Sequence, residues 1–143
     1  MAVRGRTLLL AALILCTTGL ASALADGDAE SGKAVFKKCM ACHRIGEGAV
    51  NVVGPVLTGV VGRKAGTYEF NYSTTMKNAG ASGLVWDEKT IGSYLTGPAD
   101  YLKKYLTDQG KPDLYADTPK MMFKLSDPTQ IADVIAYLKT FSK

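Results

Sequence analysis

Two cysteines and a histidine lie close together in the stretch Cys39-Met40-Ala41-Cys42-His43. Two thiols three positions apart can reach the two vinyl groups on one edge of a porphyrin and form thioethers with them. The adjacent His43 then lies under the macrocycle, where an imidazole nitrogen can bind the iron. The spacing therefore predicts covalent attachment of one c-type haem through Cys39 and Cys42, with His43 as an axial ligand.

Three other uses of the two cysteines compete with haem attachment. A thioredoxin-like redox pair is normally surrounded by a βαβ pattern, which is missing here, and it gives the following histidine no role. A tetrahedral zinc site needs four ligands, but His43 is the single histidine and the third cysteine lies far upstream. A disulfide would suit an exported protein but leaves the histidine unexplained. Haem attachment is the favoured interpretation.

The sequence predicts a cleavable export signal in residues 1–25 and one domain in residues 26–143. Arg4 and Arg6 form a basic segment, an apolar run follows, and Ala23-Leu24-Ala25 is a small-residue cleavage site. An uncleaved anchor remains the alternative, although the apolar run is short and interrupted for a membrane span. Cys16 lies inside this signal. We expect a bacterial periplasmic protein with no stable membrane insertion after cleavage.

Size and charge exclude several other classes of protein. A chain of 143 residues is one domain by length. Removing the two signal arginines lowers the formal charge from +4 to +2. That balance is too mild for a nucleic-acid-binding protein and too even for a disordered tail, so we expect a monomeric globular domain without a nucleic-acid partner.

The hydrophobic pattern predicts an all-α fold, with helices separated by long loops. One helix is expected from Asp28 to Cys42, a second after the cap Asp87, a third opened by Pro98, and a last one beginning near Asp127-Pro128. The stretch 44–67 is rich in glycine, and 108–120 carries Gly110, Pro112 and Pro119, so both are predicted to be loops. No strand pattern appears.

The second axial position of the iron needs a ligand other than histidine. The methionines beyond the signal are Met40, Met76, Met121 and Met122. Met40 lies between the two thioether positions and cannot reach the opposite face of the porphyrin. A thioether from a distant loop is favoured, and the segment 118–123 is such a loop. Spacing alone does not choose between Met121 and Met122.

The chain resembles a class I c-type cytochrome, most closely the soluble bacterial cytochrome c2 and c-550 group. The resemblance covers essentially all of residues 27–141. It rests on motifs that occur in the family's order: Gly32 and Phe36 before the cysteines, Gly54-Pro55-Val56-Leu57, Gly62-Arg63-Lys64-Ala65-Gly66, Phe70-Asn71-Tyr72, Leu84-Val85-Trp86, Tyr94-Leu95, Lys120-Met121-Met122-Phe123 and Ile135-Ala136-Tyr137-Leu138.

The resemblance implies a fold of four to five helices around one haem, and it implies a role for each matching residue. The Lys-Met-x-Phe motif indicates Met121 as the axial ligand, with Phe123 packed at the haem edge. Pro55 matches the proline whose carbonyl accepts the imidazole N–H of the axial histidine. The family's residues that donate hydrogen bonds to the haem propionates correspond to Arg63, Tyr72 and Trp86. The family's tyrosine that forms a hydrogen bond near the methionine sulfur corresponds to Tyr94.

The chain departs from the family's sequence pattern at three places, and the resemblance also implies that the first and last helices cross. Met76 stands where mitochondrial relatives carry a polar residue near an internal water, the stretch Thr107–Pro119 is longer than in those relatives, and Pro119 is an unusual neighbour for Lys120. Gly32 and Phe36 are expected to meet Val134 and Tyr137 where the first and last helices cross.

A haem with both axial positions filled by protein can change oxidation state but has no vacancy for a substrate. We therefore expect a non-enzymatic, one-electron carrier between a membrane cytochrome bc1-type complex and a terminal oxidase or photosynthetic reaction centre. Alternatives are the dedicated electron acceptor of a periplasmic dehydrogenase and a five-coordinate haem sensor or peroxidase.

Docking is expected to be guided by a basic surface around the haem edge, which would steer the protein toward acidic partners. The lysines that we expect to contribute most are Lys38, Lys120 and Lys124. The wider set that flanks the haem-attachment and methionine segments also includes Lys37, Lys64, Lys103 and Lys104.

Overall fold

The computed structural model describes residues 26–142, so the signal predicted for residues 1–25 lies outside it. Within the described range the fold is all-α, as predicted, and one isolated β-bridge joins Lys64 to Val85. None of the helices in this range is long and apolar enough to cross a membrane. The helical elements are α1 (Ala29–Phe36), α2 (Thr74–Ala81), α3 (Glu88–Thr96), α4 (Pro98–Asp108), the 3₁₀ turn η1 (Pro112–Leu114) and α5 (Pro128–Lys139).

The predicted starts of four helices are confirmed by their capping contacts. The Asp28 carboxylate accepts the N–H of Ser31 at the start of α1, and Asp127 caps α5 in the same way. Asp87 and Thr90 form a reciprocal capping box at α3. Pro98 occupies the first turn of α4, where its missing N–H costs no hydrogen bond.

One expected helix end was wrong, and one helix was missed. The first helix ends at Phe36 and not at Cys42, because the chain continues in tight turns in which Cys39 N–H donates to the carbonyl of Phe36 at 2.8 Å. Helix α2 was not predicted. Its threonines, asparagine and glycine are weak helix formers, and it is stabilised by tertiary contacts described below.

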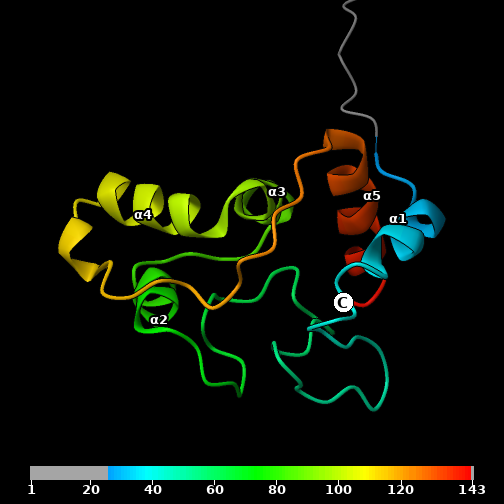
Figure 1. Ribbon diagram of the computed structural model, residues 1–143, viewed down its shortest axis with the longest axis horizontal. Coiled ribbons are helices and arrows are strands. Elements are labelled where there is room, and N and C mark those ends of the chain that lie inside the picture. Colours follow the sequence, from blue (N-terminus) through cyan, green and yellow to red (C-terminus); the bar gives the residue numbers. More distant parts are fainter. Residues whose placement is uncertain (1–25, 143) are drawn as a thin grey trace, which may run out of the picture.

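Helices α1 and α5 cross at one end of the molecule, as expected (Figure 1). A Cβ atom at Gly32 would lie 1.9 Å from the carbonyl oxygen of Asp133, so only glycine permits the two backbones to come this close. Next to this contact the rings of Phe36 and Tyr137 pack with their centroids 5.3 Å apart. The crossing fixes the position of the turn that follows α1.

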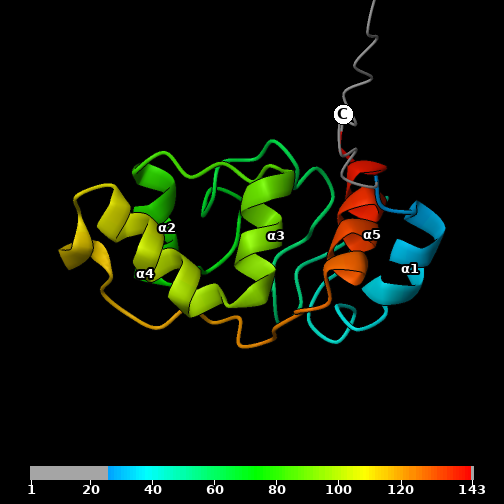
Figure 2. The same ribbon diagram turned by 90° about the horizontal axis from the view of Figure 1, so that it is seen from above.

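The remaining helices form a second group, which meets this pair where α3 packs against α5 (Figure 2). α3 lies between α5 and α4 and packs against both, while α2 packs against α4 and η1. The core between them includes the fully buried Leu84, Leu102, Leu106 and Val134. Loops, rather than a sheet or a helical bundle, span the distance between the two groups of helices, and the candidate site lies among these loops.

Candidate haem site

The two cysteines and the histidine lie in the turn that leaves α1. The N–H of His43 donates to the carbonyl of Cys39 at 2.9 Å, which closes the turn. Cys42 is exposed, Cys39 is half-buried, and both thiols are free. Burial raises the pKa of the Cys39 thiol, although the nearby Lys38 lowers it in part. Two thiols that are not joined in a disulfide are therefore presented on one turn next to an imidazole.

The imidazole of His43 is held in one tautomer. Its Nδ1 lies 2.7 Å from the carbonyl oxygen of Pro55, and a carbonyl can only accept, so Nδ1 carries the proton and donates. Burial lowers the pKa of His43, with a smaller opposing effect from the Pro55 carbonyl. The ring is therefore neutral at pH 7, with the lone pair of Nε2 available to a metal.

Gly54 holds the imidazole in place from behind. Its N–H donates to the carbonyl of Cys42 at 2.7 Å. A Cβ atom at this position would lie 2.5 Å from Cε1 of His43, so the peptide backbone of Gly54 packs directly against the ring. The Gly-Pro pair thus positions His43 through backbone atoms alone.

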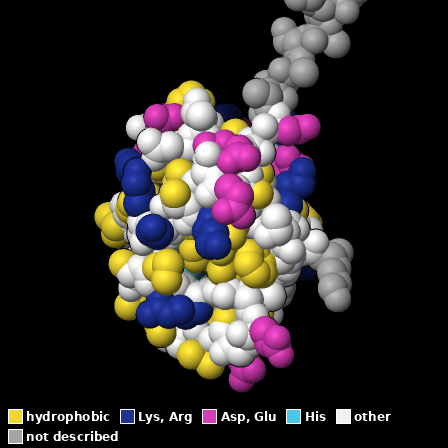
Figure 3. All heavy atoms as spheres, turned by 90° about the vertical axis from the view of Figure 1, so that its right-hand side faces the viewer, with side chains coloured by type: hydrophobic (Ala, Val, Ile, Leu, Met, Phe, Trp, Pro, Cys, Tyr) yellow, Lys and Arg dark blue, Asp and Glu magenta, His cyan; other side chains and the backbone are white. Residues whose placement is uncertain are grey.

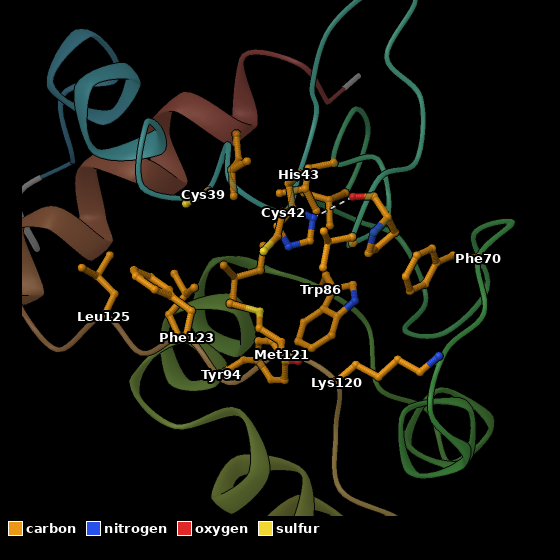
Figure 4. Close-up of a pocket in the computed structure, with 18 of the residues that line it drawn as sticks. Cys39, Cys42, His43, Phe70, Trp86, Tyr94, Lys120, Met121, Phe123 and Leu125 are labelled. Atoms are coloured by element: carbon orange, nitrogen blue, oxygen red, sulfur yellow. Dashed lines mark hydrogen bonds between the residues drawn. The ribbon is translucent and has the colours of Figure 1, made fainter.

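Cys42 and His43 reach into a cavity of about 290 Å³, and Met121 enters it from the loop before α5 (Figure 4). The lining is predominantly apolar and aromatic. It draws on the turn after α1, on the loop 53–73, and on α2, α3, α5 and the segment 120–125. The predicted site residues that it brings together are Cys39, Cys42, His43, Pro55, Arg63, Tyr72, Trp86, Tyr94, Met121, Phe123, Lys38 and Lys120.

The methionines differ in their access to this cavity. Met121 is half-buried and packs against the core, whereas Met122 is 71% exposed at the cavity mouth. Met76 is buried on α2 and also lines the cavity, and Met40 is exposed outside the lining. Of the neighbouring pair, Met121 therefore offers the more enclosed thioether.

The predicted polar and aromatic residues line the cavity with partners of their own. The Arg63 guanidinium donates to the carbonyls of Val56, at 3.0 Å, and Thr58, and it lies over the ring of Tyr68. Burial raises the pKa of Tyr72, although Arg63 counteracts this in part, and burial strongly raises the pKa of Tyr94.

The rings of Trp86 and Tyr94 pack 4.9 Å apart, centroid to centroid. Both side chains are buried and belong to the hydrophobic core. These contacts fix the shape of one cavity wall, while the pairing of these residues with propionates or with the methionine sulfur stays a prediction.

The three expected docking lysines are exposed but differ in their contacts. Lys38 donates to the side-chain carbonyl of Gln130 at 2.7 Å, Lys120 donates to the backbone carbonyl of Asn71, and both lysines line the cavity. Lys124 lies 3.8 Å from the carboxylate of Asp100, which offsets its charge. On the face shown in Figure 3, several basic side chains lie beside an apolar area, and acidic side chains lie above it.

Sequence reasoning missed several residues that shape the site. Leu125 is buried in the lining and its N–H donates to the carbonyl of Leu95 at 2.8 Å. Ser73, at the start of the unpredicted α2, also lines the cavity. The pattern Ser73-Thr74-Thr75 was an available signal, since the Ser73 hydroxyl accepts the N–H of Met76 as a helix cap.

The residues present fit a covalently attached haem. Two free thiols flank a neutral imidazole whose outward nitrogen is unprotonated, and an apolar cavity with a thioether adjoins them. A zinc site has no support, because residues 26–142 hold no group of three or more histidine, cysteine or acidic side chains placed to bind a metal ion. The donor set of imidazole and thioether suits haem iron.

Comparisons with known proteins agree with this fit. The chain matches the family described as Cytochrome c over residues 29–142. Cytochrome c2 iso-1 from Rhodospirillum centenum is 54% identical over 118 residues, which cover 82% of this chain and 98% of the relative. A cytochrome c2 from Rhodopseudomonas palustris is 53% identical over 114 residues, covering 79% of this chain and 97% of the relative.

The solved structure of cytochrome c2 from Rhodospirillum centenum superposes on this chain with a TM-score of 0.80 at 51% identity. The match covers 82% of this chain and 100% of the chain in that structure. The resemblance inferred from the motifs is thereby confirmed. The chain belongs to the cytochrome c family, is an electron-transfer protein and not an enzyme, and carries one covalently attached haem c.

Proposed function

We propose that this protein is a soluble periplasmic one-electron carrier whose haem iron is bound by His43 and Met121. It would accept electrons from a membrane cytochrome bc1-type complex and deliver them to a terminal oxidase or a photosynthetic reaction centre. The observation that carries the proposal is that a neutral imidazole and an enclosed thioether reach one apolar cavity from different segments of the chain.

The contacts of His43 orient its imidazole for metal binding. The Pro55 carbonyl holds the proton on Nδ1, and burial keeps the ring neutral, so Nε2 needs neither rotation nor deprotonation. A ligand that is positioned in advance keeps its place when the charge at the site changes. Low reorganisation of this kind suits repeated electron transfer.

The environment of Met121 supports its assignment as the second ligand. Its side chain is half-buried against the core and lines the cavity, in contrast to its exposed neighbour Met122. When bound, the haem supplies an iron centre that gains and loses one electron. If His43 and Met121 both bind the iron, the chain would leave no open coordination site for oxygen, peroxide or substrate.

Partner docking is assigned to the cavity mouth. Val53, Met122 and Phe123 are exposed apolar side chains at this mouth, and the basic groups of Lys38 and Lys120 stand beside them. Lysines around an apolar centre steer a partner with an acidic rim and then permit close, short-lived contact. Export through the signal at residues 1–25 would place the protein with such partners.

Visible spectra of the periplasmic holoprotein test this proposal, with Met121→Ala and Met122→Ala beside the wild type. We expect a c-type reduced spectrum, and a weak sulfur-to-iron band in the oxidised form that only Met121→Ala removes. Loss of the band in Met122→Ala alone would make the ligand assignment wrong. A high-spin wild type that binds carbon monoxide rapidly would contradict the six-coordinate carrier.

A further inference from the structure

A set of hydrogen bonds outside the cavity joins α2 to the segment that leads to Met121. The Asp117 carboxylate accepts the N–H groups of Thr74 and Thr75, each at 2.8 Å. These are two of the amide groups at the start of α2 that have no partner within the helix. The carboxylate therefore satisfies them from a loop that is 42 residues away from Thr75 in the sequence.

The Thr75 hydroxyl completes the connection. It donates to the carbonyl of Asp117 at 2.6 Å and accepts the N–H groups of Ala116 and Asp117, each at 3.0 Å. Thr75 is 0% exposed, so water cannot replace these bonds if the hydroxyl is removed. We call this set of bonds between Thr74, Thr75, Ala116 and Asp117 the clamp.

The clamp lies four residues before Met121, and further contacts hold the same segment. Lys120 donates to the carbonyl of Asn71, just before α2. Beyond the methionine, the N–H of Leu125 donates to the carbonyl of Leu95 at 2.8 Å. Met121 thus sits on a short span whose two ends are bound to different helices, α2 on one side and α3 on the other.

We propose that Thr75 and Asp117 are positioning residues for Met121, and that the clamp controls how readily the Met121 segment leaves the cavity. This rests on the proposed assignment of Met121 as the second ligand. Between these bonds, Met121 packs against the core and Lys124 lies 3.8 Å from the Asp100 carboxylate, whereas Met122 and Phe123 are exposed. The bonds at the two ends help to set the place of this segment, and loosening one end raises the fraction of molecules with Met121 displaced.

Competition by added imidazole measures this fraction in the oxidised holoprotein. Exogenous imidazole binds when Met121 is displaced, so its apparent affinity rises with the population of the open segment. We expect Thr75→Val, which keeps the side-chain shape but removes the hydroxyl, to bind imidazole roughly tenfold more tightly than the wild type. Asp117→Ala should act in the same direction, and Thr75→Ser should stay within about twofold of the wild type.

Asp28→Ala is the matched control. Asp28 also accepts a backbone N–H at a helix start, but it caps α1, away from the methionine segment. It should lower the stability of the protein while leaving imidazole affinity and the sulfur-to-iron band unchanged.

The outcomes separate the two proposals. A wild type without the sulfur-to-iron band would overturn the ligand assignment itself. If the band is present but Thr75→Val and Asp117→Ala bind imidazole as the wild type does, or as Asp28→Ala does, the clamp does not position Met121 and this inference alone is wrong.

Discussion

The two sides of the cavity are built in different ways. On the His43 side, the imidazole is held by Gly54 and Pro55, which lie only a short loop away in the sequence, and the holding atoms belong to the backbone. On the Met121 side, the segment is held by contacts to α2 and to Leu95, far away in the sequence. The first ligand is positioned locally, whereas the second depends on the tertiary fold.

The largest expected effect comes from adding one carbon on the His43 side. Gly54→Ala would place a Cβ atom 2.5 Å from the imidazole and 3.0 Å from the carbonyl of Cys42. The ring must move and lose its bond to Pro55, so we expect the free energy of unfolding to fall by about 3 kcal/mol. Denaturant unfolding of the holoprotein measures this change.

Gly92→Ala is the control for this substitution. Gly92 lies inside α3, where a Cβ would make ordinary contacts of 3.5 Å and 3.6 Å with Ile131 and Ile135. Alanine there should leave stability unchanged or raise it by up to about 1 kcal/mol. Equal losses at Gly54 and Gly92 would contradict the close backbone support assigned to His43.

The Met121 side should respond to acid through Asp117. Hydrogen bonds from Thr75 and Thr74 lower the pKa of Asp117 from its ordinary value of 3.8 to about 2. A depressed pKa in the folded state stabilises the protein above pH 3.8, and this contribution is lost as pH falls from 3.8 toward 2.

The difference in stability between wild type and Asp117→Asn should therefore be largest above pH 4 and shrink as pH falls toward about 2. Taking this difference removes the contribution of Asp28 and Asp87, whose pKa values are also lowered by hydrogen bonds at helix starts. A difference that is constant from pH 5 to about 2 would show that the Asp117 carboxylate does not hold the α2 amides.

The smallest effects are expected at the cavity mouth. Lys38→Gln and Lys120→Gln should each slow electron transfer with a bc1-type complex by about threefold at low ionic strength, and less as salt is added. Lys124→Gln should have a weaker effect because Asp100 lies 3.8 Å from its ammonium group. Stopped-flow measurement provides the rates.

Lys104→Gln is the matched control for the lysine series. Lys104 is exposed on α4 and pairs with Asp108 at 2.8 Å, outside the cavity lining. A rate loss as large as that of Lys120→Gln would show that docking is not centred on the cavity mouth.

The same contrast explains how much the sequence could predict. On the His43 side, Cys39, Cys42 and His43 were predicted from their spacing, because the spacing of nearby residues determines which atoms can meet. The contact of His43 with Pro55 came from the resemblance to the family. The starts of α1, α3 and α5 were predicted because their aspartate caps act on amides three residues away or fewer.

The missed features depend on contacts between distant segments. Helix α2 has weak intrinsic helix propensity and is held through Thr75 by Asp117, a pairing that no local pattern indicates. The end of α1 was placed too late because the apolar spacing continues to Cys39, while the chain has already left the helix after Phe36. The choice of Met121 over Met122 likewise came from the resemblance, since spacing left it open.

The proposed function requires Met121 and His43 to bind the same haem. The most direct test is NMR of the reduced holoprotein labelled with ¹³C at the methionine methyl groups. One methyl resonance should be shifted far upfield by the porphyrin ring, and it should vanish in Met121→Leu but persist in Met76→Leu and Met122→Leu. If no methyl is shifted, or if the shifted one disappears with Met76 or Met122, the central assignment is wrong.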